Sequence, residues 1–234
     1  MVRNKVGQQL LAIRYRSQYL REIGIVRWQR RVSRTSPVRA DGDGIELEAL
    51  ADKVRQCQAC GLHTHRQNTV FGHGSIDADW LFVGEAPGSE EDKQGLPFVG
   101  RAGQLLDSIL FSIGLARDEV YIANVLKCRP PRNRDPMGEE VIQCEPYLHK
   151  QIDRIRPEII IAMGRFAAQA LLKSTASIAE LRGQRHEYSK FRIPLVVTYH
   201  PAYLLRSPLE KQKVWKDLQF AQVLLHGSES ERST

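Results

Sequence analysis

The stretch IIIAMGRFAAQALL, residues 159–172, decides the fold class. Its first five residues are all apolar, which is typical of a strand buried on both faces of a parallel sheet. A single glycine, Gly164, separates this strand from residues 165–172, whose composition predicts a helix. A buried strand that leads directly into a helix indicates an α/β fold.

The same alternation extends outward in both directions along the chain. Strands are predicted at 80–84, 120–126 and 193–198, and helices at 45–56, 105–113 and 141–155. Ser207-Pro208-Leu209-Glu210 is a capping box with Pro at the first helical position, so it predicts the start of a closing helix. We therefore expect a parallel sheet covered by helices on both faces, with a ligand site at the carboxyl ends of its strands.

Positive charge is concentrated before this region. Residues 1–40 contain ten Lys and Arg and one acid, a net charge of +9, whereas the whole chain carries +7. Leu11, Tyr15, Tyr19 and Ile23 recur at helical spacing, and residues 30–44 have the composition of a linker. We expect a basic, partly helical arm over 1–44, a folded domain over 45–226 and a disordered tail over 227–234. The arm suits DNA, but a solvated tail and an organelle transit peptide remain open.

The sequence contains no sign of a membrane protein. No apolar run approaches the ~20 residues that span a bilayer, and the N-terminus lacks the apolar core of a secretory signal. We expect a soluble monomer in the cytoplasm, associated with the nucleoid if the cell is prokaryotic, and no membrane partner.

Four cysteines have the spacing of metal ligands: Cys57, Cys60, Cys128 and Cys144. Structural disulfides are rare inside cells, so a metal site is the better interpretation of a CxxC pair followed by two further thiols. Zinc and an iron–sulfur cluster both use four thiolates, and the spacing does not separate them. The alternative is a redox-type CxxC with two buried thiols. A metal group would fasten the segment before the sheet to the loops near residues 128 and 144.

Chemically distinctive residues follow the predicted strands. Glu85, within Gly84-Glu85-Ala86-Pro87-Gly88, places a carboxylate at a strand end where glycines let the backbone approach a ligand. The Asn124 amide suits the imide edge of a pyrimidine, accepting from N3–H and donating to O4, although it could also cap a turn. His200, as a neutral imidazole, could donate to an oxygen that gains charge, or it could be structural.

Two further segments suit contact with DNA. Lys127, Arg129, Arg132 and Arg134 form a basic loop that could bind phosphates. Leu204, Leu205 and Arg206 could supply an apolar wedge and a phosphate contact for an extruded nucleotide, although they could equally begin a helix.

Four motifs taken together resemble the family 4 uracil-DNA glycosylases. They are GEAPG at 84–88 with Glu91-Asp92, LPFVGRAG at 96–103, NVLKCRPP at 124–131 and HPAYLLR at 200–206. The motifs and the four cysteines occur in the order of the family, and the resemblance covers roughly residues 45–226.

The resemblance implies a three-layer α/β/α sandwich around a parallel four-stranded sheet, and a [4Fe-4S] cluster on the four cysteines. It implies a repair enzyme that flips uracil out of single- or double-stranded DNA and hydrolyses its N-glycosidic bond, leaving an abasic site. Phe98 would stack on the base, Asn124 would read its edge and His200 would bond O2. Gly84, Glu85 and Ala86 would line the floor of the pocket.

Comparison with the family 1 enzymes is informative. Their Gly-Gln-Asp-Pro-Tyr stands where this chain has GEAPG, so the water-activating Asp falls at Ala86 and the thymine-blocking Tyr falls at Gly88. Catalysis would then depend on leaving-group stabilisation, with Glu85 positioning a water and Glu91 as the candidate for excluding thymine. No Lys-Arg-Arg-Ile-His insertion, which marks a covalently trapped sister group, follows Pro131, so we expect turnover.

Two other functions compete with this interpretation. A non-catalytic iron–sulfur DNA-binding or polymerase-associated module could share the fold, but it would not need Asn124 and His200. A single-strand binding protein is a weaker alternative, because the only aromatic-rich basic stretch is the short arm.

Overall fold

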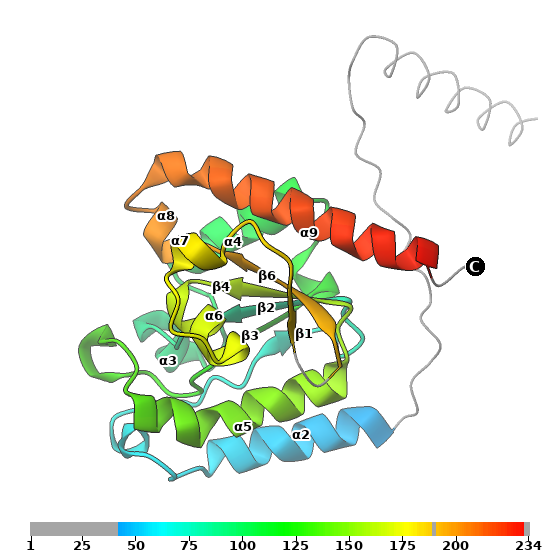
Figure 1. Ribbon diagram of the computed structural model, residues 1–234. Coiled ribbons are helices and arrows are strands. Elements are labelled where there is room, and N and C mark those ends of the chain that lie inside the picture. Colours follow the sequence, from blue (N-terminus) through cyan, green and yellow to red (C-terminus); the bar gives the residue numbers. More distant parts are fainter. Residues whose placement is uncertain (1–41, 189–190, 232–234) are drawn as a thin grey trace, which may run out of the picture. The chain divides into compact units, whose positions relative to one another are not determined.

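The computed structural model describes residues 42–188 and 191–231 (Figure 1). The helix expected over 11–23 and nearly all of the basic arm lie outside these residues. Six strands form one sheet in the order β1-β3-β2-β4-β6-β5. Their bounds are β1 His73–Gly74, β2 Trp80–Gly84, β3 Tyr121–Asn124, β4 Ile159–Met163, β5 His186–Tyr188 and β6 Ile193–Thr198.

The four central strands, β3-β2-β4-β6, are parallel, as expected. β1 and β5 are additional, and each pairs antiparallel with an edge of this core. The chain leaves β2 for β3 on one side and then returns to β4 on the other. Such a reversal opens a crevice at the carboxyl ends of the strands.

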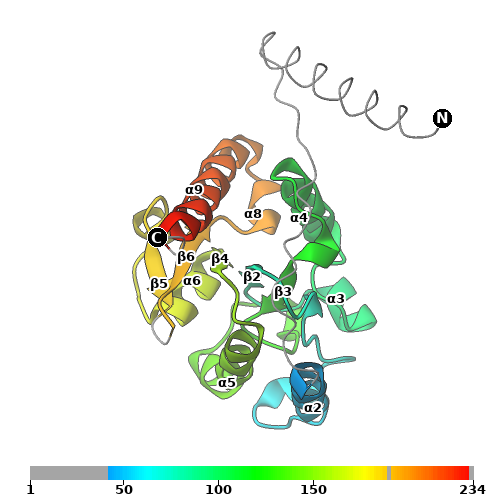
Figure 2. The ribbon, with the colours of Figure 1, turned by 90° about the vertical axis from the view of Figure 1, so that its right-hand side faces the viewer.

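Helices cover both faces of the sheet, so the three-layer arrangement is confirmed (Figure 2). Alternate strand residues face opposite layers: Leu81 and Val83 pack on one side, and Phe82 packs on the other. The first layer contains α2 (Gly42–Arg55), α5 (Gly138–Ile155), α6 (Arg165–Leu172) and α7 (Ile178–Leu181). The second contains α4 (Arg101–Ser112), α8 (Pro201–Leu204) and α9 (Lys211–Glu231). Each large apolar side chain that is fully buried here contributes about 1.5–3 kcal/mol.

Several boundaries differ from the sequence prediction. α2 begins at Gly42, inside the predicted linker, and α9 runs to Glu231, inside the predicted tail. Residues 89–94, for which the sequence predicted no helix, form the short helix α3 (Ser89–Gln94). Asp92 in α3 is buried. Its carboxylate accepts a hydrogen bond from the backbone N–H of Gln67 at 2.9 Å, which compensates for the loss of water. In the described ranges, no helix has the length and apolar character needed to cross a membrane.

Candidate active site

The carboxyl ends of the parallel strands open into a cavity of about 440 Å³. This volume lies in the usual range for small-molecule sites, roughly 300–1,000 Å³. The residues nominated from the sequence that line the cavity are Glu85, Ala86, Glu91, Phe98, Asn124, Arg134, His200 and Arg206. The fold therefore gathers, at one crevice, side chains that are more than 100 residues apart along the chain.

Asn124 is the last residue of β3 and is 1 % exposed. Its side-chain oxygen Oδ1 is buried and accepts no hydrogen bond from the described residues. A buried acceptor without a donor costs about 1–3 kcal/mol. Since the side chain also borders the cavity, a ligand N–H is the natural partner for this oxygen.

Phe98 forms a wall of the same cavity and has an unusual backbone. Its φ of 53° lies in the left-handed region, which costs a non-glycine residue about 1–3 kcal/mol. Gly103 in α4 makes this turn possible, because a Cβ there would stand 1.7 Å from the Phe98 carbonyl oxygen. The Phe98 ring lies 5.4 Å from the His200 ring, inclined by 33°. A planar ligand stacked on Phe98 would therefore also meet His200.

His200 follows β6 and precedes α8, and the chain after it fixes its ring. The Ala202 amide donates to Nδ1 at 3.1 Å, so the proton of the neutral ring is on Nε2. Burial and the charge of Arg206 lower the pKa of His200 to about 4, against the opposing effect of Glu91. The ring is a neutral hydrogen-bond donor at physiological pH.

Glu91 joins the two loops that frame the cavity. One carboxylate oxygen accepts the Gly88 amide at 3.1 Å, and the other accepts the Val99 and Gly100 amides at 2.9 Å each. These bonds hold the turn after β2 against the Phe98 loop. A Cβ at Gly88 would stand 2.7 Å from Glu91 Oε2, so glycine is required for this contact.

Glu85 is, with His200, one of two titratable groups in the cavity whose pKa is strongly altered. Burial, followed by the negative charge of Asp135, raises the pKa of Glu85 to about 7, although Arg165 acts in the opposite direction. Arg165 pairs with Asp135 at 3.4 Å. Altered pKa values of this kind are concentrated at functional sites.

The four cysteines line a second pocket, together with Arg66 and Lys127. Two N–H groups point at sulfur atoms: the Lys127 amide donates to Cys144 Sγ at 3.1 Å, and Arg66 donates to Cys128 Sγ at 3.2 Å. Donors to sulfur stabilise thiolates and tune bound clusters. The arrangement therefore suits an anionic group held by thiolates.

The donor set of this pocket consists of four thiols. Four thiolates can hold either a zinc ion or an iron–sulfur cluster. Among the described residues, no group of three or more His, Cys, Asp or Glu side chains is arranged to hold a single metal ion.

Two residues expected to contact DNA are placed elsewhere. Lys127 is 1 % exposed, and its ammonium donates to main-chain and side-chain oxygens inside the domain, so it cannot reach a phosphate. Leu204 is fully buried in the core, so the exposed apolar residue of that segment is Leu205. Arg206 borders the cavity, and Arg129 is partly exposed with its Nε donating to Asn133 Oδ1 at 2.7 Å.

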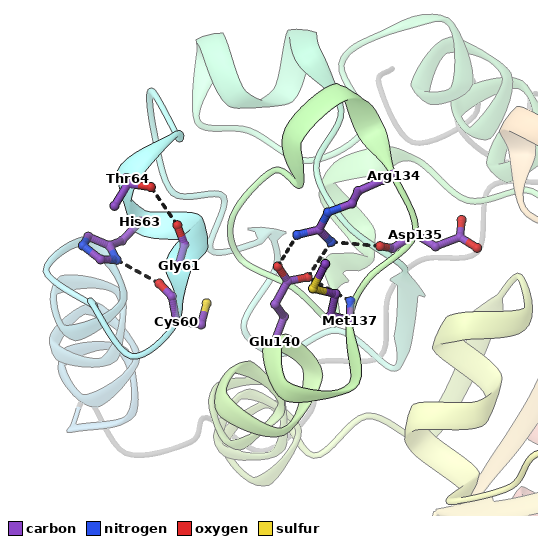
Figure 3. A network of polar contacts seen from close by, with 8 residues as sticks. All are labelled: Cys60, Gly61, His63, Thr64, Arg134, Asp135, Met137 and Glu140. Atoms are coloured by element: carbon purple, nitrogen blue, oxygen red, sulfur yellow. Dashed lines mark hydrogen bonds and ion pairs between the residues drawn. The ribbon is translucent and has the colours of Figure 1, made fainter.

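Arg134, which belongs to the predicted basic loop, has a structural partner. Its guanidinium binds both carboxylate oxygens of Glu140, at 2.5 and 2.9 Å, and donates to the Asp135 carbonyl at 3.0 Å (Figure 3). The Asp135 carboxylate points away from Arg134 in this view. Arg134 therefore holds the loop in shape. The Asp135 carboxylate does not bind Arg134 and instead interacts with Glu85 and Arg165.

The sequence interpretation gave no role to Asp135 or Tyr203, and both line the cavity. The negative charge of Asp135 adds to burial in raising the pKa of Glu85. Tyr203 lines the cavity and packs against Tyr199, with 4.9 Å between ring centroids. Its position three residues after His200 was the available signal, since that spacing places both on one turn.

Comparisons with known proteins agree with this geometry. The family model of the uracil DNA glycosylase superfamily matches residues 71–219. The type-4 uracil-DNA glycosylase of Archaeoglobus fulgidus is 44% identical over 182 residues, covering 74% of this chain and 92% of that protein. The type-4 enzyme of Thermotoga maritima is 44% identical over 162 residues, covering 69% and 84%. A DNA polymerase of Bacillus phage SP01 is 34% identical over 159 residues, covering 67% of this chain and 17% of the polymerase.

Proposed function

The chain belongs to the uracil DNA glycosylase superfamily, and we propose that it excises uracil from DNA as a repair glycosylase. The observation that carries the proposal is the buried, unpartnered Oδ1 of Asn124, beside a neutral His200 donor and the Phe98 ring. Uracil supplies an N3–H for that acceptor, an aromatic face for the ring and an O2 for the imidazole.

Base recognition follows from the Asn124 amide. Oδ1 accepts from N3–H of uracil, and the amide nitrogen donates to O4. Cytosine has an acceptor at N3 and a donor at C4, so it would leave buried groups unpaired. Rejection by unpaired polar groups reaches about 10⁴–10⁵-fold. We place thymine exclusion at Glu91, because this residue fixes the main chain of Gly88 at the wall of the pocket.

Bond cleavage follows from His200 and Glu85. The C1′–N1 bond breaks, and its electron pair moves into the uracil ring, where charge grows on O2 and O4. Nε2–H of His200 donates to O2 and stabilises that charge. A water held by the Glu85 carboxylate attacks C1′ and gives its proton to that carboxylate. The uracil anion then takes up a proton from solvent, so the products are free uracil and an abasic site.

The DNA-binding face would adjoin the cavity. Arg206 and Arg129 would contact phosphates, and Leu205, which is 38 % exposed, would fill the gap left by an extruded nucleotide. The substrate would be uracil-containing DNA, and the protein would act as a monomer in the cytoplasm, at the nucleoid of a prokaryotic cell.

We propose that the four cysteines hold a [4Fe-4S] cluster. Supporting observations are the four thiols at one pocket and the two N–H donors to sulfur. A bound cluster would tie the segment at 57–60 to the loops at 128 and 144 without redox change. Anaerobically purified protein should contain iron and absorb broadly near ~400 nm. Stoichiometric zinc without iron would contradict this proposal.

The function is tested with matched oligonucleotides that contain uracil or thymine at one position. The wild-type protein should produce alkali-labile abasic sites with uracil alone. Asn124→Asp should lose uracil excision, because the donor to O4 is gone, and should gain some cytosine excision. DNA binding without excision by the wild type would instead favour a polymerase-associated module, which the similarity to the phage polymerase makes the second candidate.

A further inference from the structure

Lys127 is a buried lysine, and the proposed function assigns it no role. Its side chain is among the largest that are fully buried in the domain. The ammonium Nζ donates to the main-chain oxygen of Asn124 at 2.8 Å and to Gln151 Oε1 at 2.5 Å. Gln151 is also buried, and its amide donates to the Phe71 carbonyl at 2.9 Å. Gln151, which is itself held by the Phe71 carbonyl, therefore keeps the ammonium at the end of β3.

The same residue touches the cysteine site. Its own amide donates to Cys144 Sγ, and the next residue is Cys128. Among the described residues, no carboxylate forms an ion pair with Lys127: Nζ donates to two neutral oxygens and lies 6.0 Å from the centre of the Phe71 ring. A buried charge without a counter-charge is strongly destabilising. Lys127 and the four thiols, which are acidic groups, line the same pocket.

We infer that Lys127 is a positioning residue that couples the four-cysteine site to the base-reading Asn124. The negative charge of the thiolate-bound group compensates the buried ammonium. The ammonium in turn fixes the main chain of Asn124, and with it the direction of Oδ1. This inference rests on the proposed function for its excision readout, but its iron readout is independent of that function.

Three substitutions test separately whether Lys127 compensates the charge of the cysteine site and whether it positions Asn124. Lys127→Met removes the charge and both hydrogen bonds while retaining an apolar side chain of similar length. Gln151→Met keeps the charge beside the cysteines and removes the brace of the ammonium. Lys150→Met is the matched control, because it removes an exposed lysine from the same helix as Gln151.

Each purified holoprotein is measured for the rate of iron release to a chelator and for single-turnover excision per iron-loaded molecule. Changes to residues that support metal ligands typically cost about 10–100-fold. Lys127→Met should release iron faster and excise uracil more slowly, each by about that factor. Gln151→Met should release iron like the wild type but excise uracil more slowly. Lys150→Met should match the wild type in both measurements.

Wild-type values for Lys127→Met in both measurements would overturn the inference. Faster iron release with normal excision per loaded molecule would overturn the coupling to Asn124. Should Lys127→Met fail to fold, Gln151→Met decides: normal excision in that variant overturns the inference. A wild-type protein that lacks excision would refute the proposed function, while the iron-release rates would still test whether Lys127 compensates the cysteine site.

Discussion

The side-chain oxygen Oδ1 of Asn124 lies 2.4 Å from the point where a Cβ atom on Gly84 would stand. The Phe98 ring is nearly as close, with Cζ 2.6 Å from the same point. Gly84 and Asn124 are register partners at the ends of β2 and β3, so neither backbone can move away without breaking the sheet. A glycine at 84 is therefore a requirement of the pocket.

Gly84→Ala tests this relationship. The added methyl group should displace both the amide and the ring, and a displacement of about 1 Å in a reacting geometry can cost about 10²-fold in rate. Single-turnover excision should fall by about that factor. Gly138→Ala is the control, because a Cβ at Gly138 meets nothing within 4 Å. Equal rates for the two variants would show that Gly84 does not determine the pocket.

The altered acidity of Glu85 predicts a pH profile. If the carboxylate receives the proton of water, the single-turnover rate should rise with pH and level off above the Glu85 pKa of about 7. At pH 6 the ionised fraction is about a tenth, so the rate should be about tenfold lower than the plateau.

Two substitutions test whether Glu85 is the group that causes this pH dependence. Asp135→Asn removes a negative charge that raises the pKa of Glu85, so the inflection should move to lower pH. Glu85→Gln should abolish the inflection. An inflection that stays in place in both variants belongs to another group. Excision rates at saturating enzyme separate this effect from any change in DNA binding.

Long apolar runs made much of the fold predictable. The bounds of β2, β4, β6 and α6 agree with the prediction to the residue, because consecutive apolar residues admit few other structures. The edge strands β1 and β5 are two and three residues long and lack such runs. Their pairing depends on neighbouring strands, so local sequence could not reveal them.

The pocket was predictable where a motif placed a residue at a strand end, as for Asn124 and His200. It was not predictable where burial depends on distant contacts. Lys127 stands among arginines and resembles a surface cation, but its partner Gln151 is 24 residues away. Leu204 and Leu205 are adjacent leucines that local sequence does not distinguish. The turn of α8 buries Leu204 and exposes Leu205.

The basic arm, of which residues 1–41 lie outside the described residues, leads to a separate prediction. Deleting residues 1–40 removes a net charge of +9. If the arm binds DNA, affinity should fall at low salt and its dependence on salt concentration should flatten, because fewer counterions are released. Single-turnover excision at saturating enzyme should change little. An unchanged salt slope would instead support a solvated tail or a targeting peptide.

We expect the neutral imidazole of His200 to stabilise the departing uracil. Its hydrogen bond strengthens as charge grows on O2, so its effect belongs to the transition state. Ground-state DNA affinity should change little, because phosphate contacts dominate positioning. Glu85→Gln provides the comparison: if Glu85 mainly positions water, its loss should be milder than the loss of His200.

The most direct measurement is therefore the single-turnover excision rate of His200→Ala, taken beside its dissociation constant for uracil-containing DNA. Loss of one such donor typically costs ~10²–10³ in rate. The rate should fall by that factor, while the dissociation constant stays within a few-fold of the wild-type value. A near-normal rate in His200→Ala would contradict this account, and the histidine would then be a structural residue at the end of β6.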